Sequence, residues 1–238
     1  MKPAAFDYVA VTDWAEALAA LQAPGAQLLA GGQSLIPLLN QRLVRPQRLV
    51  DVNGIPGVIS RREGVLRIDA TVRQAALERS SLVAAHWPLL RQAVRHVGHA
   101  ATRSRGTVGG SVAHGDPRAE LPCALAALDA RFVKADSRDV LLEIDVPPLP
   151  EGARTAFVEY ARTSGEFAQA GVAVVLAPGH AAIAVLGAGR AAAAESALRD
   201  GASTDAVAEL AAGTVEGDHP RALVAELTRR ALGEAGHP

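Results

Sequence analysis

The sequence predicts a fold of mixed helices and strands, and three observations support this. Short apolar, strand-like runs alternate with amphipathic helical patterns through residues 1–160. Two apolar runs flank a Pro178-Gly179 turn and predict a buried hairpin within residues 168–189. From about residue 190 the chain is rich in alanine and shows only helical patterns. An α+β architecture follows, in which a hairpin sheet is backed by helices in the last third.

The N-terminal part is predicted to hold a helix, a strand and a second helix. Asp13 and Glu16 have the spacing of a capping box, and apolar residues then recur at helical intervals. The run "QLLA" predicts a short strand that ends at the glycine pair Gly31 and Gly32. The next segment, "SLIPLLNQRLV", has helical spacing, and Pro37 falls in its first turn, where proline is tolerated.

The following region is predicted to alternate strands with helices. "RLVDV" predicts a strand, and "GVIS" with "VLRIDA" predicts a hairpin. Thr71 is expected to cap a helix in "VRQAALERS", and a longer helix runs from Trp87 to Gly98. Further along, "CALAALDA" predicts a helix, and "RFVKA", "LLEIDV" and "AFVEYA" predict strands. The helices expected after residue 190 are "AAAAESALRDG", "TDAVAELAAG" and "HPRALVAELTRRALGEAG".

The balance of charge argues against nucleic acid or anionic lipid as partners. The chain has 24 lysine and arginine residues against 25 aspartate and glutamate residues, without a block of like charge. Polyanions need a basic patch, so neither kind of partner is expected. The apolar stretch 168–189 is long enough to cross a membrane, but its central Pro178-Gly179 turn favours a hairpin. No membrane span is expected.

The single cysteine limits the redox chemistry of the chain. Cys123 can form no internal disulfide, and an iron–sulfur cluster usually needs four thiolates. It lies in the apolar run "LPCALAAL", which favours a buried small side chain over a nucleophile. The N-terminal residues do not have the pattern of a secretion signal. A cytoplasmic location is expected, and no metal site is predicted on this chain.

Two glycine-rich segments carry the strongest chemical signal. The first is "AGGQSL", residues 30–35, and the second is "ATRSRGTVGGSVAHGDPRAELP", residues 101–122. Glycine lets backbone N–H groups come close to a ligand, and successive N–H groups in a turn form a concave site for anions. One such segment alone is more simply explained as a tight turn. Two together favour a ligand with a pyrophosphate and hydroxyl groups, such as a dinucleotide.

Three further sequence features can be explained either by ligand binding or by structure alone. His114 is a candidate ligand contact because it lies in the second segment, while Arg103 and Arg105 could pair with phosphate or remain solvated. The run "GAGRAA" from Gly187 has the local form of a Rossmann fingerprint. No second parallel strand with an acidic end follows it, so a simple strand-to-helix turn is favoured.

The glycine-rich segments closely resemble one family. "AGGQSLIPLLNQRLVRPQRLVDV" and "RSRGTVGGSVAHGDPRAELPCALAALDA" are similar to the FAD-binding medium subunit of molybdenum hydroxylases, the group with carbon monoxide dehydrogenase and the xanthine dehydrogenases. The similarity runs from about residue 5 to residue 235. It implies a p-cresol methylhydroxylase-type FAD-binding fold at residues 1–148, with two α/β subdomains at about 1–54 and 55–148. A smaller C-terminal α+β domain with an antiparallel sheet and helices would occupy residues 149–238.

The resemblance implies FAD as the cofactor, and it assigns binding residues but no catalytic acid or base. The first segment would wrap the pyrophosphate, the second would lie on its other side and run toward the flavin, and an acidic residue beyond would contact the sugar-alcohol part. The expected cofactor-binding residues are Ala30, Gly31, Gly32, Gln33, Ser34, Leu35, Thr107, Val108, Gly109, Gly110, Ser111, His114, Asp116, Glu120 and Leu141.

The sequence departs from the family in two ways. Ser111 stands where Asn or Asp is usual, Glu120 and Glu166 stand where Asp is usual, and Glu159 replaces a common lysine. The second departure is a shortening. After Ala135 the family inserts some tens of residues before the next strand, whereas only "DSRD" remains here. The flavin would therefore be more exposed, or the two leucines of the next strand, at 141 and 142, would cover it alone.

The resemblance implies an oxidoreductase subunit that relays electrons. A molybdopterin large subunit would oxidise the substrate, and [2Fe–2S] clusters on an iron–sulfur small subunit would pass electrons to FAD on this chain and then to an external acceptor. The chain would then act within a hetero-oligomer. The alternative, favoured by the shortening, is a trimmed, non-catalytic homologue that serves as an assembly or scaffold subunit.

Overall fold

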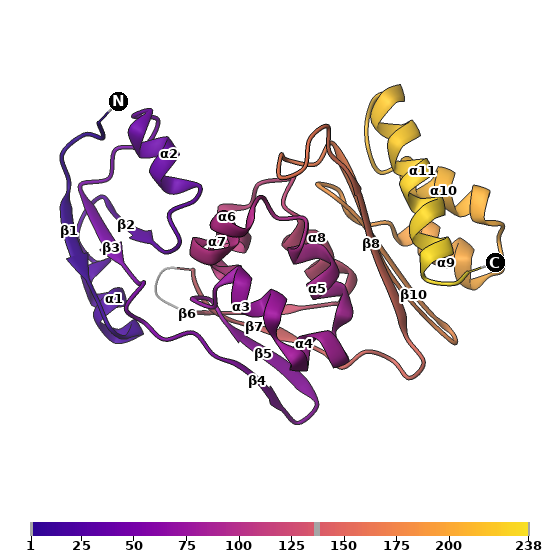
Figure 1. The fold of residues 1–238 in the computed structure, drawn as a ribbon, viewed down its shortest axis with the longest axis horizontal. Helices are drawn as coiled ribbons and strands as arrows, with labels where there is room; N and C mark the ends of the chain where they lie inside the picture. Colours follow the sequence, from indigo (N-terminus) through magenta and orange to yellow (C-terminus); the bar gives the residue numbers. More distant parts are fainter. Residues whose placement is uncertain (1, 136–138, 238) are drawn as a thin grey trace.

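The computed structural model describes residues 2–135 and 139–237, and it arranges them around three sheets that stand in a row (Figure 1). The first sheet is parallel and consists of β1 (Asp7–Ala10), β3 (Arg48–Asp51) and β2 (Ala26–Leu29), in that order. Its helices are α1 (Trp14–Ala20) and α2 (Leu35–Asn40). The predicted order of helix, strand and helix is confirmed, although α2 is shorter than expected and β1 was not predicted.

The second sheet is antiparallel and lies in the middle of the molecule. Its strands are β4 (Ile59–Arg62), β5 (Val65–Asp69), β7 (Val140–Val146) and β6 (Arg131–Ala135), in that spatial order. Its helices are α3 (Gln74–Arg79), α4 (Ser81–His86), α5 (Pro88–Val94), α6 (Ala100–Arg105), α7 (Val108–His114) and α8 (Glu120–Ala127). Leucines of α5 and α8 pack with Ile68 of β5 and Ile144 of β7 in one core.

The third sheet is also antiparallel and precedes three helices. It contains β11 (Gly189–Arg190), β10 (His180–Val185), β9 (Ala170–Ala177) and β8 (Arg154–Tyr160), and α9 (Ala192–Arg199), α10 (Thr204–Ala212) and α11 (Asp218–Glu234) follow. The predicted α+β fold, with a hairpin sheet backed by helices at its C-terminal end, is thereby confirmed.

The membrane-like hydropathy of residues 168–189 has a structural explanation. Helices α5 and α8 pack against one face of the third sheet, while α9 and α11 pack against the other (Figure 1). Ala173 and Val175 therefore belong to the core of the middle part, whereas Val172 and Val174 belong to the C-terminal core. A strand buried on both faces needs no polar alternation. Among the described residues, no helix has the length and apolar character needed to cross a bilayer.

Two local predictions were wrong and one is confirmed. Asp13 caps α1 as expected, because its side chain accepts a hydrogen bond of 2.8 Å from the Glu16 N–H. Thr71 is not a helix cap: α3 begins only at Gln74, with Arg73 as its N-cap residue. The second glycine-rich segment is not an open loop, since it forms α6 and α7. Thr107 is the N-cap residue of α7. Its backbone is extended, and its hydroxyl oxygen accepts a hydrogen bond from the Gly110 N–H.

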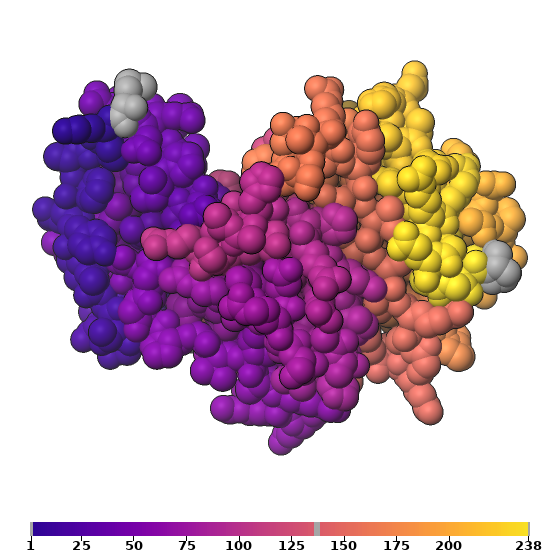
Figure 2. Space-filling view, viewed as in Figure 1, coloured from indigo at the N-terminus to yellow at the C-terminus, as the bar shows by residue number. Residues whose placement is uncertain are grey.

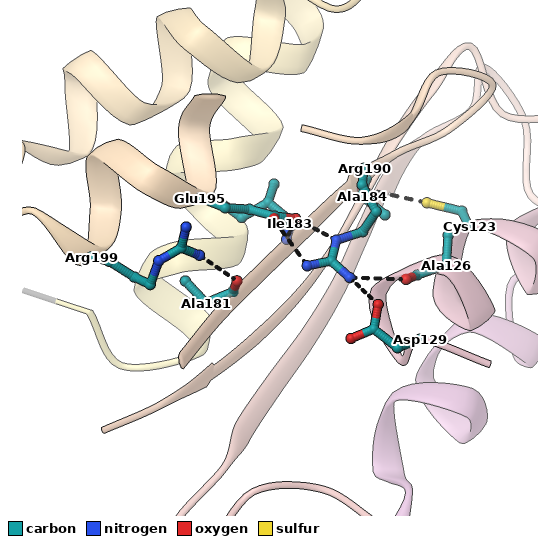
Figure 3. Close-up of polar contacts among 9 residues, drawn as sticks. All are labelled: Cys123, Ala126, Asp129, Ala181, Ile183, Ala184, Arg190, Glu195 and Arg199. Carbon is teal, nitrogen blue, oxygen red and sulfur yellow. Dashed lines mark hydrogen bonds and ion pairs between the residues drawn. The ribbon is translucent and has the colours of Figure 1, made fainter. Parts of the chain in front are cut away.

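The joint between the second and third sheets is polar at one edge (Figure 3). The Arg190 guanidinium forms an ion pair with Asp129, next to α8, and binds both carboxylate oxygens of Glu195 in α9. Glu195 also accepts a hydrogen bond of 2.9 Å from the Ile183 N–H. The Rossmann-like run thus continues antiparallel strand pairing into a helix, as the favoured strand-to-helix explanation predicted.

Cys123 faces the same joint but is inert. Its thiol lies 3.4 Å from the Ala184 carbonyl oxygen and is almost fully buried (Figure 3). Burial raises the pKa of Cys123 to about 12, so the thiolate needed for nucleophilic chemistry does not form near neutral pH. Side chains from both of the flanking sheets meet in a single core here. The proposed domain boundary at residues 148 and 149 stays a prediction.

Candidate functional site

A cavity of about 790 Å³ lies where the three parts of the molecule meet. Its walls come from the first glycine-rich segment, from residues 106–120, and from residues 165–167 between β8 and β9. In the space-filling view the surface is hollowed between the N-terminal part and the magenta and orange parts (Figure 2). The volume falls within the range of about 300–1,000 Å³ typical of cofactor and ligand sites.

The structure brings nearly all of the predicted binding residues to this cavity. Those that line it are Ala30, Gly31, Gly32, Gln33, Ser34, Leu35, Thr107, Gly109, Gly110, Ser111, His114, Asp116, Glu120 and Leu141. Val108 is not among them, because its side chain is fully buried in the core of the middle part. Segments that are some seventy residues apart in the sequence therefore form one wall.

The two glycine-rich segments touch each other directly. A Cβ on Gly31 would lie 2.7 Å from the Gly106 Cα, which is too close for any side chain. Gly32 has a φ of +72°, a backbone conformation that other L-residues adopt only with strain. The first glycine of the pair is thus required by close packing and the second by the turn of the chain.

The first segment leaves a row of backbone donors unused. Within the described part of the chain, no acceptor is found for the N–H groups of residues 32–35. Ser34 is the N-cap residue of α2, yet its hydroxyl makes no capping hydrogen bond. The segment therefore offers several adjacent N–H donors and one hydroxyl, which is the donor set that a phosphate oxygen accepts from.

The second segment uses its donors internally. The Val108 N–H donates to the Val72 carbonyl at 2.8 Å, and the Gly109 N–H donates to the Ala70 carbonyl at 3.0 Å. The Gly110 N–H donates to the Thr107 hydroxyl oxygen at 3.0 Å. A Cβ on Gly109 would lie 2.6 Å from the Ala70 Cα. These glycines let α7 pack closely on the end of β5, and they do not form a nest of free N–H groups.

A hydrogen-bond network fixes the first segment to the middle part. The Asn53 amide donates to the Ala30 carbonyl at 2.8 Å, and Arg73 donates to the Asn53 side-chain oxygen at 2.6 Å. Arg73 also donates to the Arg105 carbonyl. The network crosses from the first sheet to α3 and α6, so it holds the two glycine-rich segments at a fixed separation.

Both arginines suggested as phosphate partners lie away from the cavity lining. Arg103 forms an ion pair of 2.8 Å with Glu78 and donates to the carbonyls of Val97 and Gly98 at 3.0 and 3.1 Å. Arg105 lines a second, neighbouring cavity of about 570 Å³. Neither a lysine nor an arginine is among the described residues that line the main cavity. An anion bound there would depend on N–H and hydroxyl groups for its partners.

Two buried polar atoms of the cavity wall have no partner in the described residues. They are the Thr71 hydroxyl oxygen and the Gln74 side-chain oxygen. A buried polar group without a hydrogen bond is costly, so both atoms indicate a polar ligand or water in the cavity. No motif marks Thr71 or Gln74 as functional, because they come to the wall through the packing of the start of α3 on the second segment.

The acidic residues of the wall differ in their protonation. The Arg118 side chain hydrogen-bonds Asp116 and holds the pKa of that carboxyl below its usual value. Glu120, in the first turn of α8, is 5% exposed, and burial raises its pKa to about 7. Asp116 is therefore charged at neutral pH, whereas Glu120 keeps its proton to a higher pH than an ordinary glutamate does.

Part of the cavity wall is apolar. Val140 and Leu141 of β7 form part of the wall, as does Asp139. Residues 136–138 lie outside the described residues, so the prediction about the shortening cannot be followed through them. Trp14, Leu28 and Leu38 provide further apolar surface from the first sheet and its helices. Flat, partly apolar ring systems suit such walls.

These features define a class of protein that binds an extended nucleotide cofactor. The cavity combines unused N–H donors for a phosphate, unpaired polar atoms and acceptors for hydroxyl groups, and apolar surface for rings. The donor set and the volume fit FAD.

Comparison with known families agrees with this class. Residues 4–157 match the family described as "FAD binding domain in molybdopterin dehydrogenase". This chain belongs to that family, and FAD is the cofactor of these domains. The predicted resemblance is thereby confirmed.

Individual relatives and solved structures give the same result. The chain is 38% identical over 203 residues to the 6-hydroxypseudooxynicotine dehydrogenase complex subunit alpha of Paenarthrobacter nicotinovorans, covering 74% of this chain and 68% of that protein. It is 34% identical over 202 residues to the carbon monoxide dehydrogenase medium chain of Hydrogenophaga pseudoflava, covering 74% and 70%. The carbon monoxide dehydrogenase structure from Hydrogenophaga pseudoflava matches with a TM-score of 0.91 at 31% identity, covering 99% and 98% of the two chains.

A second solved structure extends the match. Quinoline 2-oxidoreductase from Pseudomonas putida 86 has a TM-score of 0.88 at 31% identity, again covering 99% and 98% of the chains. The predicted fold class and the predicted enzyme class, an oxidoreductase flavoprotein, are confirmed by these matches.

Proposed function

We propose that this chain is the FAD-binding medium subunit of a molybdenum-containing dehydrogenase or hydroxylase complex. The observation that carries the proposal is the cavity wall at residues 30–35, where a row of N–H groups and the Ser34 hydroxyl have no partner in the described chain. Relatives named as a complex subunit alpha and a medium chain support a role within a larger enzyme.

Each part of the wall has a role toward FAD in this proposal. The N–H groups of residues 32–35 and the Ser34 hydroxyl bind the pyrophosphate. The unpaired oxygens of Thr71 and Gln74, with Asp116 and Glu120, bind hydroxyl or ring N–H groups. The second glycine-rich segment positions the first by direct packing. FAD, when bound, supplies electron storage and transfer, and the protein holds it, orients it and limits its contact with water.

The proposal includes partner subunits and a direction of electron flow, and the names of the relatives support it. An iron–sulfur small subunit delivers electrons that a molybdopterin large subunit takes from the substrate, and an external acceptor removes them. No side chain of this chain is assigned a catalytic acid or base role in substrate oxidation. A cytoplasmic location and a hetero-oligomeric state remain predictions with this proposal.

The visible spectrum of the purified chain tests the cofactor part of the proposal. The chain is incubated with FAD, separated from free FAD by gel filtration, and its absorbance is recorded before and after denaturation. We expect a flavin spectrum and release of about one FAD per chain on denaturation, as in a one-site cofactor domain. A folded, colourless chain that releases no flavin would contradict the proposal and favour the scaffold alternative.

A further inference from the structure

A cluster of three titratable side chains lies directly behind the cavity wall. Glu120 lines the cavity, Glu159 is on β8, and His96 follows the C-terminal end of α5. The His96 Nδ1 lies 3.2 Å from the Glu159 Oε1. Glu159 and His96 are both close enough to affect the ionisation of Glu120. Three separate elements thus bring these groups together.

The three side chains differ in how far they are exposed to solvent. The His96 side chain is 40% exposed and reaches solvent, while the Glu159 side chain is only 7% exposed. Glu120 is 5% exposed and faces the cavity. One end of the cluster therefore contacts solvent, the middle is inside the protein, and the other end contacts the space that a ligand occupies.

The cluster has fewer positive than negative groups. Two carboxyl groups share one imidazole, and in the described part of the chain neither carboxylate forms an ion pair with lysine or arginine. The second oxygen of Glu159, Oε2, is buried without a hydrogen-bond partner. Two neighbouring carboxylates repel each other, which favours the protonated form of Glu120. Burial raises the pKa of Glu120 to about 7, and the hydrogen bond that His96 donates to the Glu159 carboxylate raises the pKa of His96.

Most of the titratable groups around the cluster are acidic. Asp116 acts on Glu120 from the connection before α8, and Glu234 acts on His96 from α11. The titratable groups that share the cavity with Glu120 are His114, Asp116, Asp139 and Glu166. Only His114 among these can be positive. The environment therefore favours retention of protons in the cluster.

We propose that His96, Glu159 and Glu120 form a proton-exchange path between solvent and the cofactor cavity, with Glu120 at the cavity end. The inference rests on the proposed function for the identity of the ligand. Reduction of a flavin by two electrons to its anionic reduced form takes up one proton. The electrons come from the iron–sulfur partner, Glu120 gives the proton and becomes a carboxylate, and a proton from solvent restores it through His96 and Glu159.

The first test uses the ligand-free chain with glutamate carbons labelled for NMR. We expect one carboxyl signal to titrate close to pH 7 and to be absent in Glu120→Gln. In Glu159→Gln, the pKa of His96 should fall toward its ordinary value. Glu151→Gln, a control at an exposed turn, should change neither signal. If every glutamate titrates in the ordinary acidic range, the inference is overturned without reference to FAD.

The second test follows proton uptake by the FAD-loaded chain with a pH-indicator dye after rapid photoreduction. We expect uptake to slow about tenfold or more in Glu120→Gln and Glu159→Gln, and to match wild type in Glu151→Gln. Equal uptake rates in all variants with FAD bound would overturn this inference alone. Failure of FAD to bind would instead overturn the proposed function. The proton-exchange path would then have no flavin to serve.

Discussion

The two glycine-rich segments share a sequence signal but differ in what their backbones do. In the first, the N–H groups of residues 32–35 have no acceptor in the described chain. In the second, the N–H groups of residues 108–110 donate to Val72, Ala70 and Thr107. Both segments line the same cavity. Glycine pairs thus mark two tasks, ligand contact at the first segment and close packing at the second.

This difference changes how the second segment contributes to binding. It was expected to contact the cofactor through free backbone N–H groups. Its Gly109 instead packs on Ala70, while Gly106 packs on Gly31 of the first segment. The backbone of the second segment therefore affects the cofactor only indirectly, by packing against the first segment. Direct contact with the cofactor is left to side chains such as Ser111 and His114, which line the cavity.

The largest expected effect comes from adding a methyl group to the second segment. Gly109→Ala would place a Cβ 2.6 Å from the Ala70 Cα, and overpacking of this kind costs about 3 kcal/mol or more of folding free energy. Gly233→Ala is a matched control, because Gly233 also lies in a helix but has no neighbour within 4 Å of an added Cβ. The control should gain about 0.5–1 kcal/mol. Denaturant unfolding of both variants measures this, and equal stabilities would refute the packing role.

Much of the fold could be predicted because its strands and helices have clear local patterns. The hairpin at β9 and β10 was predicted from two apolar runs and a Pro-Gly turn. Helices α6 and α7 were missed, because glycine, serine and threonine disfavour helices locally. The packing of α7 against β5 overrides that preference. Strand β1 was missed because it is short and mostly exposed.

A second prediction concerns Glu120, which follows the second segment, and the effect of pH on stability. Burial raises the pKa of Glu120 from 4.5 to about 7, so the folded chain binds more protons than the unfolded chain between these values. Stability should therefore fall as pH rises from about 4.5 to 7, by about 3 kcal/mol at most. Glu120→Gln should remove this component. Unfolding midpoints at pH 5 and 8 check it, and an unchanged pH dependence in the variant would count against the burial effect.

A third prediction separates ligand contact from packing by removing one hydroxyl from each segment. Ser34→Ala should weaken FAD binding about 10- to 30-fold, because a hydrogen bond to a charged phosphate is lost, while stability changes little. Thr107→Ala removes the cap of α7 and should cost about 1 kcal/mol of stability with a smaller loss of affinity. Fluorescence titration and thermal unfolding measure the two effects. The reverse pattern would show that the two tasks have been assigned to the wrong segments.

The smallest expected effect is at Arg103. Because this side chain pairs with Glu78 and caps carbonyls instead of lining the cavity, Arg103→Ala should change FAD affinity by less than about twofold. The same titration checks it. A loss of tenfold or more would restore the phosphate-partner role that the sequence left open.

The candidate site was predictable only where its residues form a motif. The glycines, Ser34, Asp116 and Glu120 stand in recognisable runs, so the sequence indicated them. Thr71 and Gln74 reach the cavity from one other segment of the chain and the 165–167 loop from a second, through tertiary packing. No local pattern marks such residues. Glu159 was noted only as a departure, and its contact with His96 became visible in the structure.

Amide NMR of the ¹⁵N-labelled chain during titration with FAD tests the central contrast most directly. The N–H signals of residues 32–35 should shift strongly as the phosphate accepts their hydrogen bonds. Those of Val108 and Gly109 should shift little, because their N–H groups remain bonded to Val72 and Ala70. Large shifts confined to Val108 and Gly109, with residues 32–35 unaffected, would contradict the assignment of the first segment as the phosphate-binding element.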